Sequence, residues 1–415
     1  MNEQKSRINF SARWAALGPG ILLAGSAVGT SHIVQSTRAG ADFGLGFLLV
    51  FVLITFVKYP ATRFGKDYAN ATGKSLIDNY ASYGWPVICL YSVVIMLTMA
   101  FVSAALGLVS ASIINALLPV NFNGRYLTVG ILAFSAWLLM FGKYSFLEKF
   151  NKLLVPAFTL LILAATLIVA SQSDWGALNL SFPAINKANL IYMIAIAGWL
   201  LAPMDVSVFL SLWTIEKSKT HNIDKRDRNF DFNLGYWMSL ILALCFLLMG
   251  ASLLGGNTSE LPKNGGAFIT EIIKLFSSAL GTWSYPFIAF IALTVMYSTL
   301  LTVIDGYARN VQILLKYGPA RHLKNPFNIG VLSVFVTSTL VILLFMRSFT
   351  AFIDLVGILV FVLAPIYAIL NHKAVFGRDL TLKQQPSSFM KMASLGGIIV
   401  MSLVALSYLY LRFAG

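Results

Sequence analysis

Two ionisable side chains, His32 and Asp205, stand inside long apolar stretches of the sequence. An imidazole or a carboxylate is costly to bury away from water, so such a residue is a functional candidate by default. Together the two groups can bind a cation or exchange a proton near neutral pH. The other histidines, His221, His322 and His372, fall in polar segments. We therefore take His32 and Asp205 as candidates for cation binding and for proton coupling.

Each of these residues lies where a helix is expected to be interrupted. Pro203 removes one helical donor and clashes with the preceding turn, and glycine and hydroxyl residues crowd the stretch before His32. Backbone groups freed inside a membrane must line a cavity or bind something. The residues of the candidate substrate site are Gly29, Thr30, Ser31 and His32 in the first stretch, and Ala202, Met204 and Asp205 in the second.

The composition is that of an integral membrane protein. Hydrophobic residues make up 58% of the chain and charged residues 11%, against about a quarter charged in ordinary globular proteins. No Gly-x-Ser-x-Gly or His-Glu-x-x-His motif is present, so we expect no enzyme and no cofactor. Cys89 and Cys245 lie in apolar runs, which argues against a disulfide framework. No basic groove with interleaved aromatic residues points to nucleic acid.

Eleven apolar windows are each long enough to cross the ~30 Å hydrocarbon core of a bilayer. They are continuous rather than alternating, which predicts helices and not a barrel. The predicted spans are residues 14–38, 43–64, 85–116, 126–142, 148–171, 188–213, 232–254, 282–304, 326–346, 349–370 and 389–412. The fold class is therefore all-α with 11 transmembrane helices.

The two interruptions divide these spans into repeats. They fall in spans one and six, so each is in the first helix of a five-helix half, and paired interruptions of this kind are typical of inverted-repeat transporters. We predict a cytoplasmic segment (1–13), a first repeat (14–171), an outer loop (172–187), a second repeat (188–370) and an extra span (389–412).

The basic residues indicate the orientation. Most of the 30 Lys and Arg residues fall on one side when the spans alternate, and this side is the cytoplasm by the positive-inside rule. The N-terminus is then cytoplasmic and the C-terminus outside, in a multi-pass protein of the plasma (inner) membrane in contact with lipid. Lys58 and the polar stretch 216–231 are assigned to cytoplasmic segments, the latter as a solvated loop.

Three further features have local interpretations. Segment 255–281 is expected to be an outer loop with a small interfacial helix at 268–280. Asp305 and Arg309 have the spacing of an ordinary helical ion pair. Asp354 lies within span ten and has no assigned role.

Several motifs resemble the natural-resistance-associated macrophage protein (NRAMP) family. They are Gly18-Pro19-Gly20 at the start of span one, Arg38-Ala39-Gly40-Ala41 at its end, and Ala71-Thr72-Gly73-Lys74-Ser75-Leu76 after span two. The resemblance implies a LeuT-type fold of two inverted five-helix repeats. It also implies secondary active transport of a divalent metal cation, Mg²⁺ or Mn²⁺, held where spans one and six are broken.

The metal-binding motifs of that family are largely replaced. The family's Asp-Pro-Gly-Asn falls on Gly29–His32 with no match, and its Met-Pro-His falls on Ala202, Pro203 and Met204. The remaining metal-ligand candidates are His32, Met204 and Asp205. The family's ionisable residues on spans three and nine have no counterpart in 87–116 and 326–346, which leaves His32 and Asp205 as coupling candidates.

Two alternatives to metal transport stay open. One is a transporter of a small non-metal solute such as an organic cation, with Trp199, Trp213 and Tyr297 as possible walls of an aromatic pocket. The other is a non-transporting receptor or scaffold built on a transporter fold.

Overall fold

The computed structural model describes residues 17–118, 122–141, 144–176, 178–219, 224–255, 265–318, 321–346 and 348–413. Every regular element in these residues is helical. The predicted cytoplasmic segment 1–13 and His221 lie outside the described residues. The chain is thus all-α over its described part, as expected.

The helices follow the predicted spans closely, and many extend beyond them. The first half contains α2 (Pro19–Ala27), the π-helix η1 (Ser31–Ser36), α3 (Thr37–Phe43), the 3₁₀ helix η2 (Gly44–Phe47), α4 (Leu48–Thr72), α5 (Leu76–Ser82), α6 (Trp85–Leu117), α7 (Gly124–Phe141) and α8 (Tyr144–Gln172). The remainder contains α9 (Lys187–Trp199), α10 (Val206–Ser218), α11 (Lys225–Leu254), α12 (Gly265–Leu280), the 3₁₀ helix η4 (Thr282–Ser284), α13 (Tyr285–Tyr317), α14 (Pro326–Phe345), α15 (Phe349–Phe376) and α16 (Ser388–Phe413).

The described residues contain nine helices long and apolar enough to cross a membrane. The sequence predicts 11 membrane-spanning helices. Residues 31–72 form one continuous candidate, and residues 187–218 are divided between two 13-residue helices, α9 and α10, each too short to span alone. The difference therefore arises at spans one and six, where the helices are interrupted.

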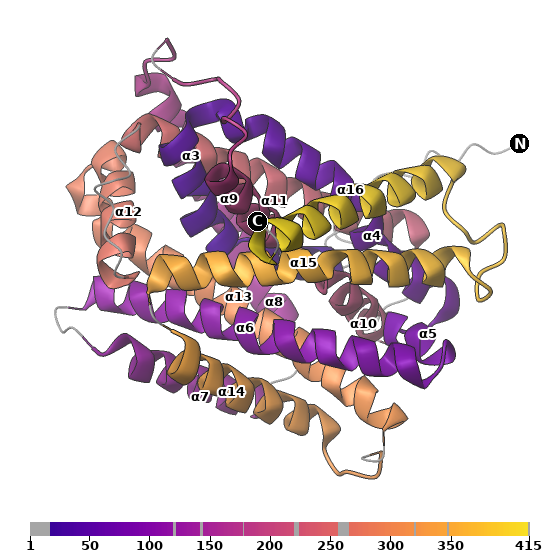
Figure 1. Ribbon diagram of the computed structural model, residues 1–415. Coiled ribbons are helices and arrows are strands. Elements are labelled where there is room, and N and C mark those ends of the chain that lie inside the picture. The colour runs from indigo at the N-terminus through magenta and orange to yellow at the C-terminus, as the bar shows by residue number, and fades with distance from the viewer. Residues whose placement is uncertain are drawn as a thin grey trace, which may run out of the picture.

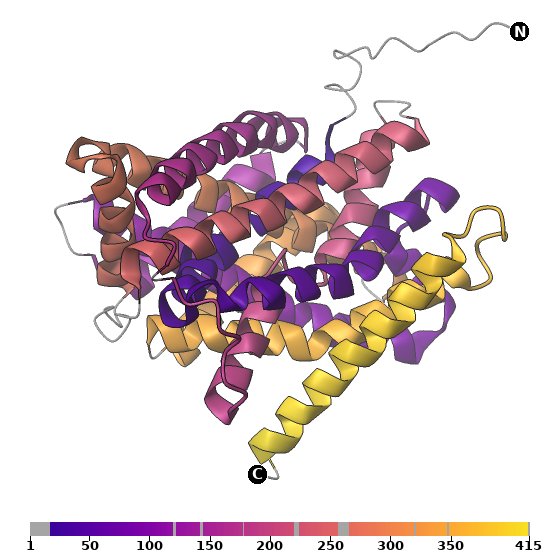
Figure 2. The same cartoon turned by 90° about the horizontal axis from the view of Figure 1, so that it is seen from above.

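Long helices surround the interrupted ones. Figure 1 shows α6, α14 and α15 running side by side along the molecule, with α5 and α12 at opposite ends. The last helix, α16, runs along one outer face (Figure 2) and packs on α15 and α4. Most of its side chains are not buried by the rest of the chain, so its apolar surface is suited to contact with lipid.

Glycines let the short helices pack closely against long neighbours. A Cβ atom at Gly235 of α11 would lie 1.9 Å from the carbonyl oxygen of Gly20 in α2. A Cβ at Gly198 of α9 would lie 1.8 Å from the carbonyl oxygen of Gly357 in α15. Small residues permit this close backbone approach in membrane helices. The α2 segment is thereby held on α11, and α9 on α15.

Two charged segments are more buried than the sequence suggests. Lys58 is 3% exposed in the interior of α4, and its assignment to the cytoplasmic side stays a prediction. The stretch 216–231 is not simply a solvated loop: α10 extends to Ser218, α11 begins at Lys225, and Asp231 is buried. Asp231 accepts hydrogen bonds from the backbone N–H groups of Gly18 (3.0 Å) and Gly20 (2.7 Å), and so caps the start of α2.

The structure also describes the Asp305–Arg309 pair and the short helix expected at 268–280. Arg309 Nε lies 2.8 Å from Asp305 Oδ2, so the predicted pair is formed. The short helix expected at 268–280 is α12, which begins at Gly265. Its placement at the membrane surface stays a prediction.

Candidate functional site

The first interruption separates α2 from η1 at residues 28–30. The Val28 backbone leaves the helical region, with φ −79° and ψ 82°. Thr299 Oγ1 of α13 lies 2.7 Å from the carbonyl oxygen of Gly25 and 2.9 Å from that of Val28. A hydroxyl has one proton and donates to one of them at a time. A neighbouring helix thus supplies the donor that the broken helix lacks.

Thr30 lies inside this interruption with an unused hydroxyl group. Its side chain is 1% exposed, and its Oγ1 atom has no hydrogen-bond partner among the described residues. A buried hydroxyl without a partner costs free energy, so such a group needs an explanation. An unpaired donor at the break is available to a bound molecule.

His32 is fully buried and hydrogen-bonded at both ring nitrogens. Nε2 lies 2.8 Å from the carbonyl oxygen of Ser239 in α11, and Nδ1 lies 2.7 Å from Ser31 Oγ. Ser31 Oγ is also 2.7 Å from the carbonyl oxygen of Ala27. Because Ser31 has one hydroxyl proton, it either donates to Nδ1 or accepts from it and donates to Ala27. The two arrangements differ by one proton on the ring, which suits a coupling role.

The second interruption separates α9 from α10 at residues 200–205. Leu201 and Ala202 have φ values of 58° and 74°, a left-handed region that non-glycine residues rarely occupy. Pro203 follows and cannot donate a hydrogen bond. The predicted break is therefore present, and its backbone is strained.

Lys58 of α4 projects into this second break. Its Nζ atom lies 2.7 Å from the carbonyl oxygens of Leu200 and Ala202, 3.2 Å from that of Ala197 and 3.5 Å from that of Gly198. The carbonyls freed by the interruption are thus taken up by a side chain of the protein itself.

Asp205 occupies the N-cap position of α10 and is 1% exposed. Its Oδ2 accepts a hydrogen bond of 2.6 Å from Tyr307 Oη in α13. It also interacts electrostatically with Lys58. Positive charge at a helix C-terminus and negative charge at an N-terminus are both favourable. The positive charge of Lys58 lies at the C-terminus of α9, and the negative charge of Asp205 lies at the N-terminus of α10. Both charges are therefore favourably placed.

The two ionisable candidates, His32 and Asp205, bond to different helices. His32 bonds to α11 and Asp205 to α13, and no hydrogen bond between described residues joins them. Met204 is buried, and its Sδ lies 3.9 Å from Thr62 Oγ1. Among the described residues there is no group of three or more His, Cys, Asp or Glu side chains arranged to hold a metal ion.

The suggested aromatic pocket is not assembled. Trp199 Nε1 donates to the carbonyl oxygen of Ile353 (2.9 Å), Trp213 Nε1 donates to Asp305 (3.1 Å), and the Tyr297 hydroxyl contacts Ser135 (3.4 Å). Three separate helices receive these contacts. The three side chains are thus held by contacts with different helices.

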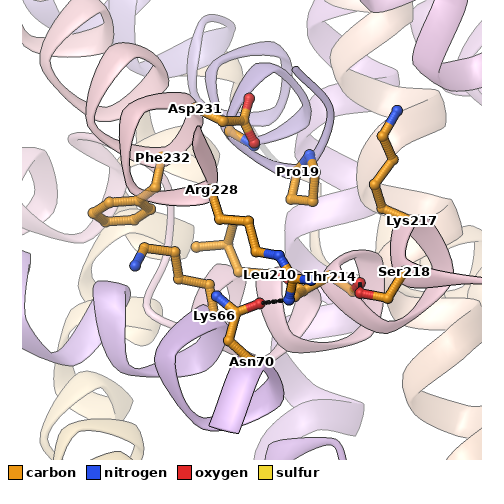
Figure 3. Close-up of a pocket in the computed structure, with 11 residues that line it drawn as sticks. Pro19, Lys66, Asn70, Leu210, Thr214, Lys217, Ser218, Arg228, Asp231 and Phe232 are labelled. Atoms are coloured by element: carbon orange, nitrogen blue, oxygen red, sulfur yellow. Dashed lines mark hydrogen bonds between the residues drawn. The ribbon is translucent and has the colours of Figure 1, made fainter. Parts of the chain in front are cut away.

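A small cavity lies beside the start of α2, between α4, α10 and α11 (Figure 3). Its volume of about 20 Å³ is enough for about one water molecule. Figure 3 shows Arg228 reaching across it to a hydrogen bond with Asn70. Lys66 and Lys217 also line it, and they pair with Asp67 and Glu148 respectively.

A second charged contact joins α3 to α15. Arg38 Nη1 lies 2.8 Å from Asp354 Oδ1, and Gln35 Nε2 donates to the same oxygen at 2.8 Å. This gives Asp354 a partner that the sequence did not identify. The contact links the helix that follows the first break to the second half of the chain.

Sequence reasoning missed three residues of the breaks: Lys58, Thr299 and Tyr307. Lys58 carried a usable signal, because it is a lone charge inside an otherwise apolar run from 48 to 62. Thr299 and Tyr307 carried none, since hydroxyl residues are common in membrane helices.

Two interrupted helices crossed by long intact ones define a LeuT-like fold. A manganese transporter of Eremococcus coleocola, solved as a point mutant, superimposes with a TM-score of 0.74 and 14% identity, covering 100% of this chain and 90% of that one. MhsT, solved with L-phenylalanine, gives a TM-score of 0.67 and 14% identity over 94% of this chain and 97% of that one. At this identity the similarity establishes the fold.

The sequence establishes the family. Residues 20–411 match the family described as natural resistance-associated macrophage protein-like (Nramp). An uncharacterized protein of Pasteurella multocida (strain Pm70) is 31% identical over 415 residues, which cover 99% of this chain and 93% of that one. This chain therefore belongs to the Nramp family of transporters and is a multi-pass membrane protein.

Proposed function

We propose that the protein is a secondary active transporter that works by alternating access around the interrupted helices α2–η1 and α9–α10. The observation that carries this proposal is the pair of breaks, one in each half of the chain, with charged or hydroxyl side chains at each. Such paired breaks are where transporters of this architecture bind substrate near the middle of the membrane.

The Nramp family suggests a divalent metal cation, Mn²⁺ or Mg²⁺, as the first candidate substrate. His32, Met204 and Asp205 are the side chains that would contribute ligands. They supply one formal negative charge, whereas divalent cations prefer several oxygen ligands with more charge. The family's acid and methionine ligands are absent, and Lys58 takes up the freed carbonyls.

The geometry favours a second candidate, a small polar solute without net positive charge. Lys58 and Asp205 bring one charge of each sign to the second break, and Thr30 offers an unpaired hydroxyl at the first. A solute that accepts or donates hydrogen bonds fits these groups, while a free divalent cation would be repelled by the ammonium group of Lys58.

Uptake into proteoliposomes distinguishes the two candidates. The purified protein is reconstituted, and uptake of Mn²⁺ and of Mg²⁺ is followed with and without an imposed pH gradient, with empty liposomes and the Asp205→Asn variant as controls. We expect no saturable metal uptake. Saturable uptake of either ion that is lost in Asp205→Asn would instead establish metal transport, and its response to the gradient would report proton coupling.

The non-metal substrate is sought in parallel by thermal shift. The folded protein is screened against small neutral and zwitterionic solutes, because a ligand that binds the native state raises Tm by mass action. Compounds that raise Tm are then tested for uptake. A screen and an uptake assay that are both negative would favour the receptor or scaffold alternative.

We further propose that the N-terminus is cytoplasmic and the C-terminus outside. The distribution of Lys and Arg supports this orientation. A protease-cleavable tag at each end, probed in right-side-out vesicles, should be cut at the C-terminus only. Cleavage of the N-terminal tag alone would reverse the assignment.

A further inference from the structure

The buried lysine of α4 has an environment made of oxygen acceptors. Four backbone carbonyls from the end of α9 and from the break surround Lys58 Nζ, two of them at 2.7 Å. Lys58 is 3% exposed, so water contributes little to its surroundings. Lysine is almost never buried in this way unless it is paired.

The hydrogen-bonding pattern favours an ammonium group. Carbonyl oxygens only accept, and an ammonium has three N–H donors and no lone pair. A neutral amine would offer two donors and would direct its lone pair toward one of the remaining oxygens. The α9 C-terminus adds negative potential at the same point. The charged form of Lys58 is therefore the one that fits this cage.

The hydrogen bonds from Lys58 also explain why the backbone is strained at this break. The left-handed φ values of Leu201 and Ala202 shape the turn that carries the carbonyl oxygens of Leu200 and Ala202 to 2.7 Å from Nζ. Strain at such positions persists only where surrounding interactions compensate it. Hydrogen bonds from a charged donor are the stronger kind and supply that compensation.

We propose that Lys58 is a tethered cation: its ammonium occupies the carbonyl cage of the second break in place of a free cation and thereby excludes cations from it. This deepens the proposed function, since it makes Lys58 a specificity-determining residue at the same break. The cage itself is tested by binding and stability, without any transport measurement.

The test is cation rescue of a lysine variant. Lys58→Met keeps most of the length of the side chain and removes its charge, which leaves the carbonyls without a donor. We expect its Tm to fall by several degrees and to rise again with increasing Na⁺ or methylammonium chloride, relative to choline chloride at equal ionic strength. Lys58→Ala, with more space, should respond more strongly to methylammonium. Wild type should show no such rise.

Matched variants make the result decisive. Lys66→Met removes another buried lysine of α4, one that pairs with Asp67, and it should lose stability without rescue. Lys58→Arg keeps the charge and should show no rescue. Saturable stabilisation of wild type by these cations, or a Lys58→Met protein whose Tm ignores them, would overturn the proposal. If Lys58→Met does not fold without salt, purification with and without methylammonium supplies the same comparison.

The outcomes separate this inference from the proposed function. Rescue without any detectable uptake would support the tethered cation and leave transport unsupported. Solute uptake by wild type, without rescue of Lys58→Met, would support transport and remove the tethered cation.

Discussion

Individual charges at this site are explained by the helix ends they face. Lys58 meets the C-terminal carbonyls of α9, and Asp205 stands at the N-terminus of α10. His32 lies at the other break and exchanges hydrogen bonds with Ser31 and Ser239. Three of the buried ionisable side chains are therefore placed at broken backbone.

Replacing Asp205 should separate transport from folding. Asp205→Asn keeps the shape and can still accept from Tyr307, so we expect at least a tenfold loss of solute uptake with a small change in Tm. Tyr307→Phe is the control, because losing this one hydrogen bond to a charged group costs about 1.5–3 kcal/mol of stability and leaves the carboxylate charge. Normal uptake by Asp205→Asn would remove Asp205 from the site.

His32 is expected to carry a coupling proton. His32→Gln preserves a polar side chain of similar reach but cannot take up a proton, so the pH dependence of uptake should flatten. The uptake rate of wild type and variant is measured across a series of pH values at fixed membrane potential. An unchanged profile would assign His32 to structure alone.

Asp78 of α5 should set part of the acid stability. Burial raises its pKa, but hydrogen bonds from Ser75 and Tyr317 outweigh this effect and hold the pKa below its ordinary value of 3.8. The stabilisation is therefore fully present above the unfolded pKa and is lost as pH falls through the lower folded pKa. Asp78→Asn should lower Tm at pH 7 and show a shallower decline below about pH 4.

The Ser75 capping box supplies the control for Asp78. Ser75 accepts from the Asp78 backbone N–H, and Asp78 accepts from that of Ser75. Ser75→Ala should cost about 1 kcal/mol while leaving Tyr317 bonded to the carboxylate (2.6 Å). If Asp78→Asn and wild type lose stability in parallel on acidification, Asp78 does not contribute.

At the scale of elements, the break in span six is a turn whose backbone conformation is unfavourable for the residues that occupy it. Pro203 could be seen in the sequence to end a helix, but the left-handed conformation falls on Leu201 and Ala202, which have no preference for it. The break is thus imposed by packing and by Lys58 as well as by proline.

Substitutions at Ala202 should report this strain. Ala202→Gly removes the Cβ penalty and is expected to leave Tm unchanged or raise it, whereas Ala202→Val should destabilise by about 1–2 kcal/mol. The measurement is thermal unfolding in detergent. Ala195→Gly, in the middle of α9, is the control and should cost about 1 kcal/mol. A loss in Ala202→Gly as large as that of the control would contradict the strain.

At the scale of the molecule, ion pairs join helices on both sides of the breaks. Arg38 and Asp354 join α3 to α15, and Lys217 and Glu148 join α10 to α8. Figure 1 places α3 and α10 toward opposite ends of the molecule. Alternating access would require these contacts to open at different steps of the cycle.

A double-mutant cycle should detect the coupling of Arg38 to Asp354. Arg38→Ala and Asp354→Ala are each expected to lower solute uptake severalfold, and the double variant should be no worse than the more severe single one, since one contact is lost in all three. Lys152→Ala, which removes a different ion-pair partner of Glu148, serves as the control. Additive losses would show that the two residues act independently.

The sequence by itself determined the membrane class, the helix positions and the two breaks, because apolar length, glycine and proline act locally along the chain. The NRAMP resemblance and the LeuT-type fold also followed from its motifs. The side chains that hydrogen-bond to the interrupted helices could not be predicted in this way. Lys58 lies 144 residues from Ala202 in sequence, and Thr299 and Arg38 meet partners at greater separations still. Only tertiary packing brings a lysine of span two to the break of span six, because a buried charge is stable only where the folded chain gathers acceptors around it.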